Sequence, residues 1–284
     1  MAGEYWFDSH DGRRLFSRVY AAPGANAPVV LCLHGLMRNS RDFEELAPHL
    51  AARCRVIAPD VRGRGFSARD PDVNNYQIPV YLTDTMALLA ALGAARVSII
   101  GTSMGGLMAM VFAAMQPGRV ASIVLNDVGP ELDPRGLERI RGYAGKSPPV
   151  RSWEQAVAQV RSIYGTAWPG LSDERWERIA RLSYRADAAG VPEADADPLI
   201  AVPLRDNKAA APNLWPLWGT LAKTPVLAIR GALSDVLSEV TLARMRSEKR
   251  DLAVLEVANR GHPPLLDEPE SLAAIEGFLG AAAP

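Results

Sequence analysis

Residues 97–116 read VSIIGTSMGGLMAMVFAAMQ, and this stretch says more about the chain than any other of its length. An apolar run at 97–100 leads into a glycine-rich turn at 101–105, and apolar residues at helical spacing follow it. Strand, sharp turn and helix in this order are typical of a G-x-S-x-G nucleophile elbow, which places a serine at the tip of a sheet. Glycines are needed around that serine, because a Cβ would hold the strand and the helix apart.

Ser103 lies between Gly101 and Gly105 in this turn. A plain strand–helix connection with a capping serine would use the same residue types. The buried strand before the turn and the long apolar helix after it favour the elbow instead. The helix end behind the serine would also favour negative charge that develops during a reaction. We therefore expect Ser103 to be a catalytic nucleophile.

The composition is ordinary for a globular protein, with 48% hydrophobic and 22% charged residues. A net charge of −1 and the lack of a basic stripe speak against a nucleic-acid partner. No apolar span approaches the roughly 20 residues of a transmembrane helix, and the first residues lack the pattern of a signal peptide. We expect a small-molecule substrate and no membrane partner, and the choice between a monomer and a homo-oligomer stays open.

The cysteines and histidines give no sign of a metal or cofactor site. Cys32 lies in a predicted core strand and Cys54 directly precedes the next one, and for both a buried reduced thiol is favoured over a disulfide. This favours a cytoplasmic protein. The four histidines lack the close Cys/His spacing of a metal centre. We therefore expect no metal and no cofactor.

Strand and helix patterns alternate along most of the chain. Residues 4–20 predict a β-hairpin with its turn at Asp11-Gly12. Apolar runs then predict buried strands at 29–33, 55–58, 97–100 and 120–125, separated by helices at 40–52, 78–92 and 105–116. The fold class is therefore α/β, with a mostly parallel sheet flanked by helices.

The alternation breaks between about residues 130 and 216. Short helices are predicted there at 152–163 and 172–184, and the sheet resumes with strands at 226–229 and 253–257 before a helix at 270–279. We expect a core of residues 1–129 and 217–284, with residues 130–216 inserted as a helical lid. The alternative is a segment that only pads the fold. Its three tryptophans, Trp153, Trp168 and Trp176, favour a lid over a binding pocket.

Four segments of the chain together resemble the α/β-hydrolase superfamily. They are His34-Gly35-Leu36-Met37 after the first core strand, DVRGRGFS at 60–67, the G-x-S-M-G-G elbow at 101–106, and Gly261-His262 after the last strand. The resemblance covers nearly the whole chain and implies the α/β-hydrolase fold. It also implies a Ser-His-acid triad in the order serine, acid, histidine.

The triad needs a histidine as base and a carboxylate behind it. His262 is the best candidate for the base, because it alone among the histidines follows the final strand on a loop. Two aspartates compete for the acid. Asp235 follows the strand at 226–229, where the family usually places it, and Asp127 follows the strand after the nucleophile. We favour Asp235 and keep Asp127 as the alternative.

The resemblance also implies an oxyanion hole made of two backbone N–H groups. One would belong to Met104, directly after the nucleophile, and the other to Leu36, with Met37 second. His34 is interpreted as a residue that holds this loop in place. The residues that shape the 60–67 loop are Asp60, Arg62, Gly63 and Gly65.

These features predict a serine hydrolase that cleaves a small carboxylic ester or lactone through an acyl-enzyme. The same triad also serves C–C bond hydrolysis of vinylogous diketone acids and cofactor-free perhydrolysis. A small-ligand receptor on the same fold is the non-enzymatic alternative. A diketone acid would need a cation near its carboxylate, and the lid offers Arg139, Arg141, Arg181 and Arg185. Their spacing aims none of them at Ser103, so we favour the ester.

Overall fold

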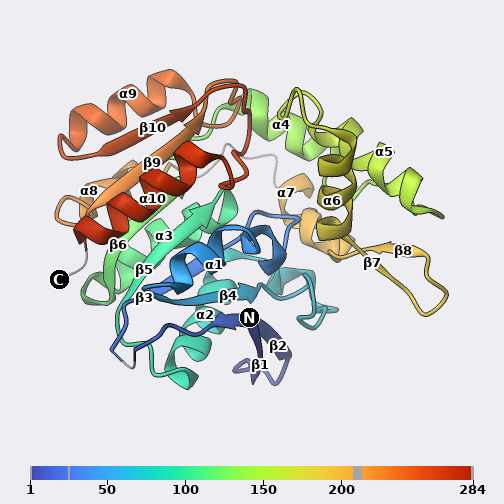
Figure 1. Ribbon diagram of the computed structural model, residues 1–284, viewed down its shortest axis with the longest axis horizontal. Coiled ribbons are helices and arrows are strands. Elements are labelled where there is room, and N and C mark those ends of the chain that lie inside the picture. The colour runs from blue at the N-terminus through green and yellow to red at the C-terminus, as the bar shows by residue number, and fades with distance from the viewer. Residues whose placement is uncertain (1, 25, 207–212, 283–284) are drawn as a thin grey trace.

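The computed structural model describes residues 2–24, 26–206 and 213–282, and its centre is one sheet of eight strands. The sheet has the order β1-β2-β4-β3-β5-β6-β9-β10 (Figure 1). Its strands are β1 (Ala2–Asp8), β2 (Arg14–Tyr20), β3 (Val29–Leu33), β4 (Arg55–Asp60), β5 (Val97–Thr102), β6 (Val120–Asn126), β9 (Val226–Gly231) and β10 (Ala253–Val257). β2 runs antiparallel to β1 and β4, and the other neighbours are parallel. The mostly parallel sheet predicted from the sequence is confirmed.

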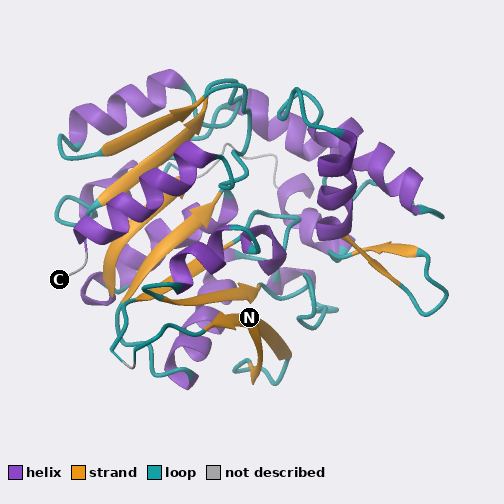
Figure 2. Ribbon diagram, in the orientation of Figure 1, coloured by secondary structure: helices purple, strands orange, loops and turns teal. Residues whose placement is uncertain are grey.

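Helices cover both faces of this sheet (Figure 2). The α-helices are α1 (Leu46–Ala51), α2 (Ile78–Ala91), α3 (Met104–Met115), α4 (Pro134–Tyr143), α5 (Trp153–Tyr164), α6 (Asp173–Ser183), α7 (Val202–Asp206), α8 (Trp215–Thr220), α9 (Glu239–Glu248) and α10 (Pro269–Ala282). Short 3₁₀ turns lie at Ser40–Phe43, Val73–Asn75, Pro117–Arg119 and Pro198–Ala201. No described helix is both long and apolar enough to cross a membrane.

Each central strand contributes side chains to both faces, which explains its unbroken apolar sequence. In β3, Leu31 and Leu33 belong to the apolar core beneath α2, α3, α8 and α9. Val30 and Cys32 belong to a second core, beneath α1 and α10. Side chains alternate between the two faces of a strand, so a strand that is covered on both faces is apolar at successive positions.

Two local predictions differ from the structure. The helix expected at 40–52 is divided into the 3₁₀ turn Ser40–Phe43 and α1. The first turn stands apart because Asn39 caps it and the buried Asp60 carboxylate accepts the Ser40 N–H. In the inserted segment, a small hairpin of β7 (Tyr184–Ala186) and β8 (Pro192–Ala194) was not expected. Strands of three residues are too short to show alternation.

The segment between β6 and β9 packs partly on itself. In Figure 1 its helices α5 and α6 and the β7–β8 hairpin stand to the right of the sheet. The helices α5 and α6 lie close to their predicted positions. They enclose an apolar cluster of their own, whose buried members are Val150, Ala156, Val160, Tyr164, Ala167, Trp168, Trp176, Ile179, Ala180 and Tyr184.

Backbone hydrogen bonds join this segment to the loop after β4. Gly65 N–H donates to the Asp195 carbonyl and Asp197 N–H donates to the Gly63 carbonyl, both at 2.8 Å. Arg64 and Ala196 form an antiparallel bridge between these bonds. The 60–67 loop is therefore held from the side of the inserted segment as well as from the sheet.

The turn at 101–105 has the close contacts that its glycines predict. A Cβ on Gly101 would collide with the backbone of Gly105, and a Cβ on Gly105 would collide with the Leu33 carbonyl. Ser103 has a φ of 52° and a ψ of −115°, a conformation that costs energy in a residue with a Cβ. The packing of α3 on β3 and β5 holds this conformation in place.

We predict that Gly105→Ala lowers the free energy of unfolding by about 3 kcal/mol, because the new methyl group overpacks the contact with Leu33. Gly277 is the matched control, since it also lies in a helix but has open space where its Cβ would be. Gly277→Ala should raise the free energy by about 0.5–1 kcal/mol through helix propensity. Urea unfolding curves measure both, and a tolerated Gly105→Ala would contradict the described contact.

Candidate active site

Ser103 and His262 lie in direct contact at the carboxyl ends of the strands. Ser103 stands between β5 and α3, and its N–H donates to the Asn126 carbonyl at 3.0 Å. Its Oγ lies 2.8 Å from Nε2 of His262, which follows β10. The structure thus brings together two residues that are 159 positions apart in the sequence.

The partner of His262 on its other side is Asp127, at the end of β6. Nδ1 of His262 lies 2.9 Å from Oδ2 of Asp127, and the Asp127 side chain is fully buried. Asp127 also accepts hydrogen bonds from Gly231 N–H at 2.8 Å and from the Ser234 hydroxyl at 2.6 Å. A buried carboxyl group needs hydrogen-bond partners, and these contacts supply them.

The prediction that Asp235 lies behind His262 is wrong. Asp235 accepts two hydrogen bonds from Arg139 on α4, at 2.5 and 2.8 Å. Burial alone would raise the pKa of Asp235, but the bonds from Arg139 outweigh it and leave the pKa below its ordinary value. Its neighbour Ser234 faces Asp127 instead. Asp127, the alternative from the sequence, therefore takes the place beside His262.

Sequence reasoning missed the residues that support this arrangement. Ser234 and Arg139 carry no motif of their own, and Arg139 meets Asp235 only because α4 folds against the loop after β9. Trp168 was expected in a pocket wall. Its indole N–H donates to the Pro263 carbonyl at 2.7 Å, so it also steadies the loop that carries His262.

Leu36 and Met104, the expected oxyanion donors, border the same space as Ser103. A Cβ on Gly35 would lie 3.9 Å from the Ser103 Cβ, so this loop passes close to Ser103. The Gly35 carbonyl accepts hydrogen bonds from His34 Nδ1 at 2.8 Å and from Arg38 N–H at 3.2 Å. These bonds set the orientation of the Gly35–Leu36 peptide group, which carries the Leu36 N–H.

His34 holds the loop after β3 in place, as the sequence indicates. While its Nδ1 contacts Gly35, its Nε2 accepts the Val61 N–H at 3.0 Å. One nitrogen must donate and the other must accept, so the ring is neutral. Complete burial, aided by the Arg64 charge, lowers the pKa of His34 to about 3. His34 is therefore a fixed link between this loop and the loop after β4.

The 60–67 loop is shaped by Asp60 and Arg62. Asp60 accepts the backbone N–H groups of Ser40 and Phe66, at 2.7 and 2.8 Å. The buried guanidinium of Arg62 pairs with three carboxylates, those of Asp11, Asp70 and Asp84. This agrees with the loop-shaping roles that the sequence suggests.

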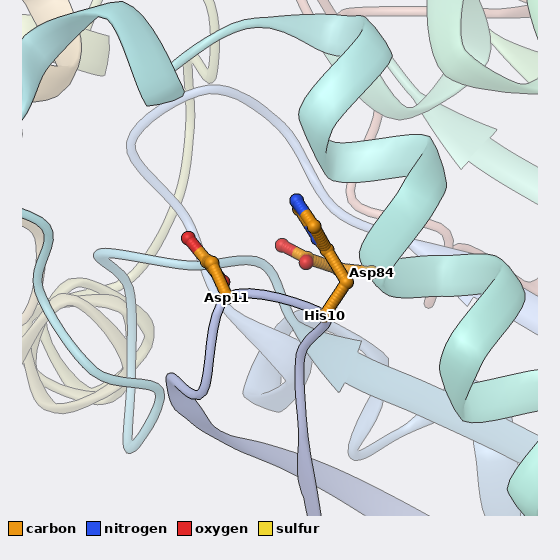
Figure 3. A group of neighbouring side chains, drawn as sticks. All are labelled: His10, Asp11 and Asp84. Carbon is orange, nitrogen blue, oxygen red and sulfur yellow. The ribbon is translucent and has the colours of Figure 1, made fainter.

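His10, Asp11 and Asp84 form the group most suited to a metal ion among the described residues (Figure 3). Arg62 already donates to Asp84 at 2.7 and 2.8 Å and to Asp11 at 2.9 and 3.1 Å. A guanidinium with these contacts supplies the positive charge that the carboxylates need. The group is best described as part of an ion-pair cluster.

Ser103 lies between an apolar and a more polar cavity. The apolar one, of about 360 Å³, is lined by side chains such as Leu107, Val128, Ile140, Ile200 and Val236. The other side of Ser103 opens to Arg38, Tyr143, Tyr164 and Trp168. The first three of these also line a further cavity of about 460 Å³ beneath the inserted segment. A substrate could thus extend in both directions from the serine.

The arginines that line the polar side are all engaged by carboxylates. They are Arg38 with Asp42, Arg41 with Asp195, Arg175 with Asp267, and Arg178 with Glu45. None of these four arginines is therefore without a carboxylate partner.

The sequence of residues 28–269 matches the alpha/beta hydrolase fold family. The chain belongs to this family. As an α/β hydrolase, it is 36% identical to the 3-hydroxybutyrate-oligomer hydrolase of Cupriavidus necator, over 91% of its own length and 90% of the relative's. The crystal structure of an alpha/beta hydrolase from Novosphingobium aromaticivorans matches with a TM-score of 0.92 at 43% identity, covering 98% of both chains.

A second hydrolase relative matches a smaller part of this α/β hydrolase. The chain is 34% identical to the 2-hydroxy-6-oxo-2,4-heptadienoate hydrolase of Pseudomonas putida over 57% of its own length and 56% of the relative's. The family and the hydrolase relatives identify the protein as an enzyme of the hydrolase class.

We predict that Asp127→Asn lowers kcat by about 10⁴-fold, because the amide would favour the wrong tautomer of His262. Asp235→Asn is the matched control. It should weaken the contact with Arg139 and lower the melting temperature by a few degrees, with kcat within about tenfold of the wild type. Steady-state kinetics with an activated ester such as p-nitrophenyl butyrate distinguish the two variants. A crippled Asp235→Asn beside an active Asp127→Asn would reverse the assignment.

We predict that His34 makes stability fall as the pH drops below 6.5. The folded protein leaves His34 neutral, while the unfolded chain takes up a proton, so stability is complete above pH 6.5 and declines toward the folded pKa of about 3. The decline approaches about 1.4 kcal/mol per pH unit. Urea unfolding of His34→Gln at pH 7, 6 and 5 should show a smaller slope than the wild type. His49→Gln is the control, because the His49 side chain is exposed on α1, and it should keep the wild-type slope.

Proposed function

We propose that this hydrolase cleaves small carboxylic esters through an acyl-enzyme. The observation that carries the proposal is the line of hydrogen bonds from Asp127 through His262 to Ser103 at the elbow. Ser103 is the nucleophile, His262 the general base and then the general acid, and Asp127 the residue that orients His262.

The geometry suits acyl transfer in two steps. His262 Nε2 takes the proton from Ser103 Oγ as the oxygen attacks the ester carbonyl. The carbonyl oxygen becomes negative and would be stabilised by the Leu36 and Met104 N–H groups. His262 then protonates the departing alcohol. A water molecule activated by the same histidine releases the acid from Ser103.

The arginines near Ser103 already have partners, and this favours a neutral substrate over a diketone acid. The arginines on the polar side are paired with carboxylates. The arginines of the inserted segment that the sequence offered are engaged as well: Arg139 with Asp235, Arg181 with Glu177, Arg185 with Asp195, and Arg141 with the Leu204 carbonyl. A carboxylate buried here would have to compete with these partners. An acyl chain in the apolar cavity needs none of them.

The relative that hydrolyses 3-hydroxybutyrate oligomers narrows the substrate class. We propose that short oligoesters of 3-hydroxy acids are good substrates, since its similarity extends over 91% of this chain, and that their terminal carboxylate stays in solvent and is not buried in the cavity. Such an ester has a chain on both sides of the scissile bond. The cavities on the two sides of Ser103 fit that requirement.

We further propose that residues 130–216 act as a lid on a core formed by residues 1–129 and 217–284. Tyr143, Tyr164 and Trp168 of this segment line the space beside Ser103. The segment also touches the core through Arg139 and through the bonds at residues 195–197. A lid in this position would select substrates and exclude water.

The test is fluorophosphonate labelling combined with a substrate panel. The wild type should be labelled and Ser103→Ala should not, with little change in melting temperature. The panel contains p-nitrophenyl acetate and butyrate, dimers and trimers of 3-hydroxybutyrate, an uncharged lactone and a dienoic diketone acid. We expect kcat/KM to be highest for the esters. A hundredfold preference for the diketone acid would establish C–C hydrolysis, and persistent labelling of Ser103→Ala would exclude Ser103.

A further inference from the structure

Arg64 is a fully buried cation without an acidic partner in the described part of the chain. Its guanidinium donates to the carbonyls of Leu36 at 2.9 Å and Arg62 at 2.8 Å, and to Met104 Sδ at 3.5 Å. It lies over the rings of Tyr81 and Tyr76, at 4.8 and 6.0 Å from their centroids. All of these contacts are with neutral groups.

Arg62, two residues earlier in the same loop, is a buried arginine with a structural role and differs from Arg64 in its partners. It is equally buried, but three carboxylates surround it. A buried charge that lacks such partners is expensive, and an apolar side chain of similar size would fill the same space without that cost. The charge at Arg64 therefore calls for an explanation other than packing.

The contacts of Arg64 suggest a functional explanation, because Arg64 contacts Leu36 and Met104, the two residues expected to bind the oxyanion. Nε holds the carbonyl of Leu36, and Nη2 contacts the side chain of Met104. A single guanidinium thus bridges the loop after β3 and the first residue of α3.

Together with His34, the hydrogen bond from Arg64 to Leu36 fixes the peptide groups on both sides of Leu36. The peptide group before Leu36 is fixed by His34, which contacts the Gly35 carbonyl. The peptide group after Leu36 is fixed by Arg64, which contacts the Leu36 carbonyl. The second group carries the N–H of Met37, the other candidate donor from the sequence. Whichever of the two amides receives the oxyanion, its peptide plane is held by a buried side chain.

We propose that Arg64 is a positioning residue that presets the oxyanion hole. It acts through its contacts with Leu36 and Met104. Preset donors stabilise charge that develops in the transition state more than they stabilise the bound substrate. Loss of Arg64 should therefore lower kcat with little effect on KM. This inference rests on the proposed ester hydrolysis.

The test uses Arg64→Met, Arg64→Lys and a matched control, Arg119→Met. Arg119 also donates to backbone carbonyls, those of Ala94 and Ala95, and lies over the Phe112 ring, but it sits beyond the far end of α3. The measurements are kcat and KM for p-nitrophenyl butyrate, the inhibition constant of butylboronic acid, and the melting temperature. A boronate forms a tetrahedral adduct on a nucleophilic serine and so reports on the oxyanion hole.

For Arg64→Met we expect kcat to fall about 10- to 100-fold, less than or similar to the loss of an oxyanion donor. KM should stay within about threefold, and the boronate should bind more weakly by the same factor as kcat falls. Arg64→Lys should recover part of both losses, and it carries the test alone if Arg64→Met does not fold. Arg119→Met should match the wild type in kcat and boronate binding.

Two results would overturn the inference. One is a folded Arg64 variant with kcat and boronate affinity within twofold of the wild type. The other is a rise in KM at constant kcat, which would mean that Arg64 shapes the pocket only. A wild-type protein that neither hydrolyses esters nor reacts with a fluorophosphonate would instead refute the proposed function, and this inference with it.

Discussion

The contact of α3 with β3 and β5 is the constraint on which the site depends. The backbone of Gly105 lies against Leu33 so closely that no Cβ fits between them. This contact pushes Ser103 into a positive φ of 52° and turns its side chain toward His262. It also brings the start of α3 beside the loop that continues from Leu33 through Gly35. One backbone contact therefore sets both the conformation of Ser103 and the position of α3 relative to the loop after β3.

A second constraint is the complete burial of the Asp127 carboxyl group. A carboxylate without exposure needs donors, and these come from Gly231, Ser234 and His262 on two other loops. Because the strands are parallel, their carboxyl ends lie at one edge of the sheet, and loops from β6, β9 and β10 can meet there. Two hydrogen bonds from Gly231 and Ser234, at the end of β9 and in the loop after it, thus hold the Asp127 side chain in place. This leaves Asp235 to pair with Arg139 of the inserted segment.

The sequence was sufficient for the parts of the fold that depend on local pattern. Apolar runs and glycine spacing predicted the strands and the elbow, and the resemblance to the α/β-hydrolase superfamily implied the meeting of Ser103 with His262. The acid could not be chosen in this way, because Asp127 and Asp235 both follow core strands. The choice depends on which loop turns inward, and that is decided by Ser234 and Arg139. Their partners lie 107 and 96 positions away, which no local pattern can show.

The 60–67 loop connects the inserted segment with the region around Ser103. Its backbone is bonded to residues 195–197, and the side chain of Arg64 reaches from it to Leu36 and Met104. Because Arg64 itself forms the bridge with Ala196, a shift of that segment would move the backbone from which the guanidinium extends. The inserted segment and the loop after β3 therefore cannot be displaced independently. The geometry beside Ser103 is thus set by distant parts of the chain as much as by the elbow itself.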